Sequence, residues 1–164
     1  MLFRSLMPTA AKVMGKVIIK RISRGVDKKL RKEQAGFRTG RSTIEQIFVL
    51  RNIIEQSDEW NASLYICFIN YEKAFDNVHR ETLWRIMGSY GIPPKLVRMV
   101  QAMYKGSKCA VVDGAGKTDW FDIESGVRQG CVMSGFLFLL VIDWVMRKML
   151  RDRKSTRLNS SHRL

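Results

Sequence analysis

The sequence predicts an α+β fold, and three observations carry this prediction. Several long segments place apolar residues three and four positions apart, which is the period of amphipathic helices. One short run, "SLYICFIN" (63–70), is apolar on both faces, as buried strands are. Two further short runs flank "DGAG" (113–116), a glycine-containing connection typical of a β-hairpin. We therefore expect helices packed on one face of a small sheet.

The first predicted helix covers residues 9 to 32, where apolar residues recur at helical spacing. Lys12, Lys16 and Lys20 are four residues apart, so they form one basic stripe on another face of this helix. Such a stripe either follows a phosphate backbone or is an ordinary solvated face. The sequence leaves both interpretations open.

The second predicted helix follows a glycine-containing loop, "QAGFRTGRST" (34–43). Ser42 and Glu45 have the spacing of a capping box, which marks the start of a helix. The buried strand 63–70 is expected to come after this helix. The helix also presents a row of apolar residues that we expect to be buried, namely Ile44, Ile47, Phe48, Leu50, Ile53 and Ile54.

The second half of the chain is predicted to contain three helices and the hairpin. Two helices are expected near 79–90 and 94–105, because Gly91 suits a helix C-terminus and the two prolines after it prevent continuation. "KCAVV" and "KTDWFDI" are the expected hairpin strands. The loop "ESGVRQGCVMSG" then leads into an apolar helix from about 135 to 149.

The charge balance of the chain is unusual for a globular domain. Its 164 residues contain 29 Lys and Arg against 15 Asp and Glu, which gives a net charge of +14 and a pI near 10.2. Hydrophobic residues make up 46%, enough for the core of one domain or of part of a larger one. A folded domain this basic usually binds nucleic acid or an anionic membrane surface.

The cysteines and the lack of a targeting segment predict an intracellular protein, nuclear or cytoplasmic. Cys67, Cys109 and Cys131 form neither a disulfide framework nor a zinc motif, so we expect buried, reduced thiols. Residues 1–20 lack the apolar centre of a signal peptide. The most apolar stretch, "GFLFLLVIDWVM", is too short to span a bilayer and contains Asp143. We expect no membrane role.

Four blocks of sequence resemble the fingers and palm of reverse transcriptases from non-LTR (LINE-type) retrotransposons. They are, in order, "EQAGFRTGRSTIEQIF", "FINYEKAFDNVHRETLW", "GIPPK" and "GVRQGCVMSGFLFLLVIDWVMR". One such block is a weak pattern, but four in order are specific. The resemblance covers about residues 5 to 151. It implies a partial right-hand polymerase fold, with a helical fingers remnant (1–56) and an incomplete palm (57–151), and it implies an RNA template, a DNA primer and dNTP as partners.

The resemblance also implies a Mg²⁺ requirement that this chain does not meet. In the family, an Asp at the end of the first palm strand joins two Asp of a later hairpin to hold the divalent ions that catalyse nucleotide joining. The matching position here is Asn70, a neutral amide, whereas Mg²⁺ prefers carboxylates. The paired-aspartate hairpin has no counterpart after residue 149. We therefore expect an inactive chain without bound metal, and a sheet that lacks central strands and exposes an unpaired edge.

Five residues match family positions that contact the incoming nucleotide. Phe75 matches the aromatic residue that excludes a ribose 2′-hydroxyl, although a Phe is ordinarily a core residue. Gln129 matches the Gln that faces the nucleotide and the template base, and Gly130 lets the backbone approach closely. Arg38 and Arg41 are candidates for gripping the triphosphate. The sequence does not decide between the two arginines, and lone arginines in a loop are usually surface residues.

The last thirteen residues differ from the rest of the chain. "DRKSTRLNSSH" (152–162) resembles the translation of a sequencing-library adapter, so residues 152–164 are expected to be a non-native tail; a natural disordered basic tail is the alternative. Without this tail, 25 basic and 14 acidic residues remain, a net charge of +11. That surplus motivates a second hypothesis beside the inactive polymerase fragment, namely a non-enzymatic basic module that binds RNA or DNA.

Overall fold

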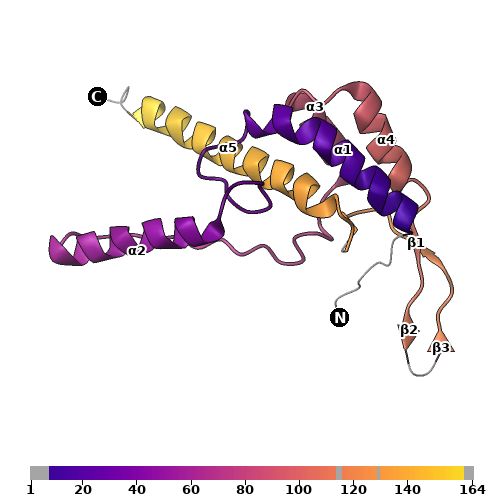
Figure 1. Cartoon of the computed structure of the whole chain (residues 1–164). Helices are drawn as coiled ribbons and strands as arrows, with labels where there is room; N and C mark the ends of the chain where they lie inside the picture. The colour runs from indigo at the N-terminus through magenta and orange to yellow at the C-terminus, as the bar shows by residue number, and fades with distance from the viewer. Residues whose placement is uncertain (1–7, 114–115, 129, 161–164) are drawn as a thin grey trace.

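The computed structural model describes residues 8–113, 116–128 and 130–160, without the side chains of Asp113 and of 152–160. Five helices and four short strands follow one another along these described residues (Figure 1). They are α1 (Thr9–Asp27), α2 (Thr43–Glu59), α3 (Arg80–Ser89), α4 (Pro94–Tyr104), β1 (Lys108–Cys109), β2 (Val112–Asp113), β3 (Gly116–Lys117), β4 (Phe121–Asp122) and α5 (Ser134–Ser160).

Four of the helices form the core. Figure 1 shows α1, α3 and α4 packed around the first half of α5, while the second half of α5 projects beyond them. Each of the four helices buries one apolar stripe, as amphipathic helices do. Among the most deeply buried side chains are Ile18 and Val26 of α1, Leu83 and Met87 of α3, Val100 of α4, and Leu137, Leu139 and Leu140 of α5.

The predicted glycine-terminated end of α3 is confirmed. Gly91 has a φ of +75°, and its N–H donates to the carbonyl of Gly88 at 2.8 Å. The N–H of Ile92 donates to the carbonyl of Met87 at 3.2 Å, so the two bonds together form a Schellman motif. Glycine adopts this left-handed conformation without the steric cost that a Cβ brings. Pro94 then begins α4.

The predicted hairpin is also confirmed, but its ladder is interrupted. β1 pairs antiparallel with β4, with Lys108 opposite Asp122, and β2 pairs antiparallel with β3, with Val112 opposite Lys117. Between the two ladders the N–H of Thr118 donates to the carbonyl of Val111 at 2.9 Å. The hairpin projects from the helices as a separate arm (Figure 1).

The predicted strand 63–70 is wrong. Residues 62–70 run as an extended segment, but they pair with no strand of the described chain (Figure 1). Tyr65 is 94% exposed and Phe68 is 80% exposed, where we expected burial. Cys67 is exposed as well, so the expected burial of its thiol is wrong too. The composition is that of a buried strand, but a strand persists only where neighbouring backbone satisfies its N–H and C=O groups.

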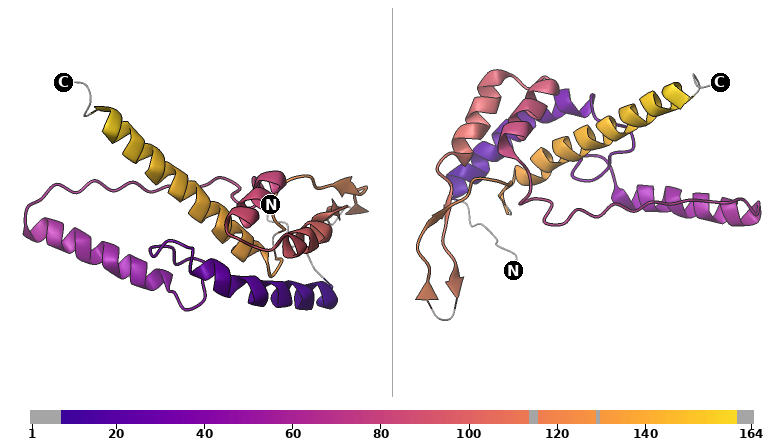
Figure 2. Two further views of the ribbon diagram at one scale, coloured as in Figure 1. Left: turned by 90° about the horizontal axis from the view of Figure 1, so that it is seen from above. Right: turned by 180° about the vertical axis from the view of Figure 1, so that it is seen from behind.

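Helix α2 begins as predicted but does not bury its apolar face. The Oγ of Ser42 accepts the N–H of Ile44 at 3.1 Å, which confirms the N-cap. The expected burial of the apolar row is wrong, because α2 contains no buried residue; Ile44 is 74% exposed and Phe48 is 61% exposed. Both views in Figure 2 show α2 standing apart from the four packed helices. Without a paired strand 63–70, α2 has no sheet to pack against.

Two helix ends also differ from the prediction. Helix α1 ends at Asp27 rather than at residue 32, and the backbone N–H of Arg31 donates to Asp143 at 3.1 Å instead of continuing the helix. Helix α5 continues through Ser160, past the predicted end at 149. None of the helices among the described residues is long and apolar enough to cross a membrane.

Candidate functional site

Three of the sequence blocks converge at the start of α5. The ring of Phe75 stacks on that of Phe138 with centroids 4.7 Å apart, and Phe37 from the loop at 34–42 meets Phe75 edge-on at 6.1 Å. Phe37 has a φ of +56°, which is uncommon for a bulky residue and is the kind of strain found at functional sites. Its ring covers Gly135, where a Cβ would lie 2.7 Å from a ring carbon. The loop is therefore held by aromatic packing.

A second set of contacts joins the Phe75 segment to the loop before α5. The N–H of Gly126 donates to the carbonyl of Val78, and the N–H of Val127 donates to the carbonyl of Phe75, both at 2.8 Å. Gly126 has a φ of +79°, and a Cβ there would lie 2.8 Å from the carbonyl oxygen of Asp76. Only glycine fits this close backbone approach. The structure thus brings the "AFDNV" and "GVRQG" motifs together.

The side chain of Arg80 also binds this loop. Its Nε, Nη1 and Nη2 donate to the carbonyls of Gly126, Ile123 and Ser125 at 3.0, 2.6 and 3.1 Å. The guanidinium also lies over the ring of Tyr104, 5.2 Å from the centroid. Burial lowers the pKa of Arg80. Sequence reasoning missed this residue, because an arginine at the first position of a helix carries no distinguishing pattern.

Arg38, one of the two arginines expected to grip a triphosphate, is engaged within the protein. Its Nε donates to Oδ1 of Asp27 at 2.6 Å, and its Nη1 donates to the carbonyls of Arg31 and Gln34 at 2.9 and 3.2 Å. Its Nη2 donates to Oδ2 and to the carbonyl of Asp27. The Arg38 hydrogen bond holds the pKa of Asp27 below its usual range. Nε and Nη2 therefore tie the loop to the end of α1, and Nη1 ties it to the segment that follows α1.

Arg41 and Gly130 are placed differently. Arg41 is exposed, and its side chain makes no hydrogen bond within the part of the chain that the structure describes. Gly130 is exposed as well and has a φ of +86°. Gln129 lies outside the described residues. An exposed guanidinium, a glycine turn and an aromatic cluster are groups that bind phosphate and stack on a base or sugar.

Asn70 takes no part in the ring contacts of the aromatic cluster. It is exposed in the extended segment before the turn at 72–77, and its amide makes no hydrogen bond within the described residues. The turn itself is closed by the N–H of Asp76 and that of Asn77, which donate to the carbonyl of Lys73 at 2.9 and 3.0 Å. Because no strand forms here, no sheet edge positions Asn70.

A buried charged cluster around Asp143 holds the core together. Oδ1 of Asp143 accepts from the backbone N–H and the Nε of Arg31 at 3.1 and 3.0 Å. Oδ2 accepts from the hydroxyl of Tyr90 at 2.5 Å and from Nε of Arg147 at 2.7 Å. Burial raises the pKa of Asp143, but these hydrogen bonds outweigh it and leave the pKa below its ordinary value. The cluster joins α5 to the end of α3 and to the segment after α1.

The sequence contained one indication of this cluster. Asp143 is the single acidic residue of the predicted apolar helix 135–149, and Arg147 follows it at the i,i+4 spacing that allows an ion pair. A charge in such a position is buried only if it is paired. The partners Arg31 and Tyr90 are 112 and 53 residues away along the chain, and no local pattern predicts them.

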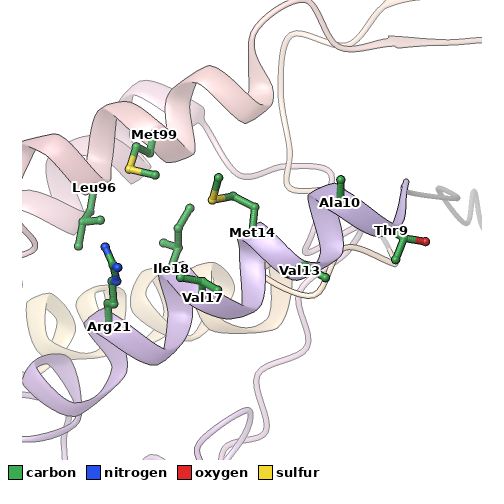
Figure 3. A pocket seen from close by; sticks show the side chains of 9 residues that line it. All are labelled: Thr9, Ala10, Val13, Met14, Val17, Ile18, Arg21, Leu96 and Met99. Carbon is green, nitrogen blue, oxygen red and sulfur yellow. The ribbon is translucent and has the colours of Figure 1, made fainter.

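A groove between α1 and α4 is chemically different from the site at the start of α5. Figure 3 shows its lining, which is apolar except for Thr9 and Arg21; the apolar residues are Ala10, Val13, Met14, Val17, Ile18, Leu96 and Met99. Its volume is about 610 Å³. A nucleotide site needs convergent polar groups to fix the phosphates. This groove has few of them, so it is not our candidate.

Comparison with known proteins finds a family match over most of the chain. The family model described as "Reverse transcriptase (RNA-dependent DNA polymerase)" matches residues 2–159. The "Transposon TX1 uncharacterized 149 kDa protein" of Xenopus laevis is 29% identical over 139 residues, which is 85% of this chain and 11% of that protein. The "RNA-directed DNA polymerase from mobile element jockey" of Drosophila funebris is 29% identical over 137 residues, 82% of this chain and 15% of the relative.

The Pol polyprotein of the type-2 retrotransposable element R2DM of Drosophila melanogaster is 27% identical over 116 residues, 71% of this chain and 11% of the relative. The chain therefore spans only a small part of the length of these relatives. The match of the family model over nearly all of the chain nevertheless shows the family to which the chain belongs. This chain belongs to the reverse transcriptase (RNA-dependent DNA polymerase) family, and its relatives include proteins of non-LTR retrotransposons.

Proposed function

We propose that the chain is the fingers and part of the palm of a retrotransposon RNA-directed DNA polymerase. In this proposal residues 1–56 are a fingers remnant, residues 57–151 are a partial palm of a right-hand fold, and residues 152–164 are a non-native tail. The observation that carries the proposal is the convergence of the loop at 34–42, the Phe75 segment and the start of α5. These segments lie far apart in the sequence, and each contains residues that match nucleotide-contacting positions.

We propose that this convergence is a remnant of a dNTP site. Arg41, exposed on the loop, binds the triphosphate, because the guanidinium of Arg38 is occupied by Asp27 and by backbone carbonyls. Phe75 lies beneath the sugar, and Gly130 allows the nucleotide to approach the backbone. An RNA template and a DNA primer would complete the site.

We further propose that the chain does not catalyse nucleotide addition. Members of this family generally use Mg²⁺, yet the residues present do not fit such a site. Asn70 offers a neutral oxygen where a carboxylate is needed, and the described residues contain no group of three or more His, Cys, Asp or Glu that could hold a metal ion. If the missing charge is worth about 4 kcal/mol in the transition state, the rate falls roughly 10³-fold from this position alone.

A primer-extension assay tests this part of the proposal. The purified chain is incubated with an RNA template, an annealed DNA primer, dNTPs and Mg²⁺, and we expect no template-dependent product. Asn70→Asp is expected to remain inactive, since it returns one carboxylate and leaves the other ligands missing. Template-dependent extension by either protein would show that a working metal site exists and would refute the proposal.

The basic stripe on α1 favours a second function, namely binding of RNA or DNA without catalysis. Helix α1 carries five basic residues and one acidic residue, Asp27. Lys12, Lys16, Lys20 and Arg24 are all exposed and follow one another at intervals of four residues, about 6 Å along the helix. Such a row of cations is suited to a phosphate backbone, and the affinity it confers falls steeply with salt.

A salt titration of a fluorescent RNA–DNA hybrid tests the second function. The double variant Lys16→Ala, Lys20→Ala is expected to lower the slope of log affinity against log salt by about two. The control Lys108→Ala, Lys117→Ala makes the same change in net charge on the hairpin arm, and we expect a smaller effect on the slope. Equal effects of the two double variants would show that net charge alone drives binding and would remove α1 as the interface.

A further inference from the structure

Arg128 is bound at both ends, through its side chain and through its backbone carbonyl. Its Nη2 donates to the hydroxyl of Ser107, and that hydroxyl donates to the carbonyl of Tyr104 at 2.6 Å. The carbonyl of Arg128 accepts from the N–H of Cys131 at 3.2 Å and from the hydroxyl of Ser134. Both serines are buried, with exposed fractions of 5% and 3%. Arg128 therefore joins the segment between α4 and β1 to the start of α5.

The ring of Tyr104 contacts two guanidinium groups. The guanidinium carbons of Arg80 and Arg128 are 5.2 and 5.5 Å from its centroid, within the range of a cation–π contact. Tyr104 is 4% exposed, and such a contact is stronger where water is excluded. Within the described residues neither arginine forms an ion pair with an Asp or Glu. The two guanidinium groups are therefore held by an aromatic ring and by neutral oxygens.

The same contacts fix the base of the hairpin. The N–H of Ile123 donates to the carbonyl of Ser107 at 2.8 Å, and this bond joins the two ends of the hairpin. Arg80 donates to the carbonyl of Ile123 at 2.6 Å, while Arg128 donates to the hydroxyl of Ser107. The hairpin base is thus attached to α3 through Arg80 and to the turn before α5 through Arg128. Gly130 is exposed on that turn, with a φ of +86°.

An arginine at position 128 introduces electrostatic repulsion. Two like charges near one ring repel each other, and the charge of Arg128, together with the larger effect of burial, lowers the pKa of Arg80. A neutral side chain would avoid this repulsion. Arginine adds length and several N–H donors in a fixed plane, and this geometry lets one side chain contact both the Ser107 hydroxyl and the Tyr104 ring. The side chain therefore supplies position rather than charge neutralisation.

We propose that Arg128 is a positioning residue, which fixes the turn that Cys131 closes and thereby the backbone of Gly130 at the proposed dNTP site. The guanidinium group contacts Ser107 and the ring of Tyr104, so Arg128 acts on the nucleotide through the backbone. This role rests on the proposed function only for the assignment of Gly130 to the nucleotide. The contacts that fix the turn are all made between residues of this chain.

Nitrogen-15 relaxation of the full chain tests the position of the turn without any nucleotide. Arg128→Met removes the charge and the N–H donors but keeps an unbranched side chain. The NMR order parameters of the Gly130 and Cys131 amides are expected to fall from about 0.85, which is typical of rigid backbone, to below about 0.6. Arg128→Lys keeps a cation with N–H donors and is expected to retain most of the order. Tyr90→Phe weakens the fold at Asp143 instead and should leave both order parameters unchanged.

Titration with a labelled dNTP shows whether this position matters to the nucleotide. If the turn of Arg128→Met adopts the binding conformation about one tenth of the time, the dissociation constant rises about tenfold. Arg98→Met repeats the charge change at an exposed position of α4 and should leave the dissociation constant unchanged. Tyr90→Phe should leave it unchanged as well, in a buffer where every variant is folded.

The two measurements separate the possible failures. Order parameters that Arg128→Met does not lower, or that Tyr90→Phe lowers equally, would overturn the positioning role. Lost order at Gly130 with an unchanged dissociation constant would overturn the link from the turn to the nucleotide. An original chain that binds no dNTP would refute the proposed nucleotide site, while the order parameters would still decide whether Arg128 positions the turn.

Discussion

Replacing Asp143 by Asn is expected to destabilise the fold by about 3 kcal/mol, and the cluster around Asp143 explains the size of this effect. The carboxylate is 0% exposed and accepts from Arg31, Tyr90 and Arg147. Asn keeps one oxygen and replaces the other by an NH₂ group. The two donors that bonded the replaced oxygen then face another hydrogen-bond donor. A hydrogen bond to a charged group contributes about 1.5–3 kcal/mol, and two of them are lost.

The exposure of Arg31 and Arg147 determines how large the loss of unfolding free energy is. Removing one partner of a fully buried ion pair costs about 3–5 kcal/mol. The side chain of Arg31 is 17% exposed and that of Arg147 is 37% exposed, so both regain some hydration when the carboxylate is gone. We therefore expect the lower end of the range. Since small domains are stable by about 5–15 kcal/mol, the variant should remain folded but with a clearly lower midpoint of unfolding.

Urea unfolding at a fixed protein concentration measures this loss, with far-UV circular dichroism and tryptophan fluorescence as two signals. Asp119→Asn is the matched control, because it makes the same chemical change on an exposed carboxylate of the hairpin and should alter the free energy of unfolding by less than about 0.5 kcal/mol. Tyr90→Phe removes one donor to Asp143 and should cost about 1–2 kcal/mol. A loss for Asp143→Asn no larger than that of the control would refute the reasoning.

Three further predictions concern the pH dependence of Asp143, the close approach at Gly126 and the two arginines of the loop at 34–42. Because the pKa of Asp143 is lowered in the folded state, the stability that this carboxylate contributes is present above its unfolded pKa of about 3.9 and is lost as the pH falls through the lower folded pKa. Asp143→Asn should therefore flatten the acid side of a plot of unfolding free energy against pH. Parallel plots for the variant and the original chain would contradict this. Gly126→Ala should lower the free energy of unfolding in urea by more than about 1–3 kcal/mol, since φ is +79° and the new Cβ meets the carbonyl of Asp76. Gly25→Ala is the control, because Gly25 lies within α1 and a Cβ there meets no neighbouring atom within 4 Å, so it should be neutral or stabilise by up to about 1 kcal/mol. Equal effects of the two substitutions would argue against the close approach at Gly126. Arg41→Ala should weaken binding of a labelled dNTP and leave the midpoint of urea unfolding unchanged. Arg38→Ala should lower that midpoint, because it removes the hydrogen bonds to Asp27 and to backbone carbonyls. Weaker dNTP binding by Arg38→Ala with no effect of Arg41→Ala on binding would show that Arg38 contacts the triphosphate.

Local patterns predicted the helices better than they predicted burial. The end of α3 at Gly91, the start of α2 at Ser42 and the hairpin around 113–116 depend on residues within one turn of each other, so the sequence contains their causes. The burial of α2 and of residues 63–70 depends on partner strands, and the described chain has none for them. Their apolar pattern was correctly recognised, but it led to a wrong prediction of what covers them.

The candidate site shows the same division. The motifs offered Arg38, Arg41, Phe75, Gln129 and Gly130 as candidates, and these assignments stay predictions. The structure adds contacts around them that the motifs did not predict, made by Phe37, Arg80 and Gly126. The motifs could not separate Arg38 from Arg41, because the difference is a contact with Asp27, which lies 11 residues before Arg38 along the chain.

By itself, the sequence determined the family of this chain, its excess of positive charge and the neutral amide at position 70, since these are properties of residue identity and spacing. Only the tertiary structure decided that Asp143 organises the core, that Arg38 is engaged internally, and that residues 62–70 lie open to solvent. The physical reason is that burial and pairing depend on partners far away along the chain. The chemistry of a side chain determines which kind of partner it requires, and the tertiary structure determines whether such a partner lies in contact with it.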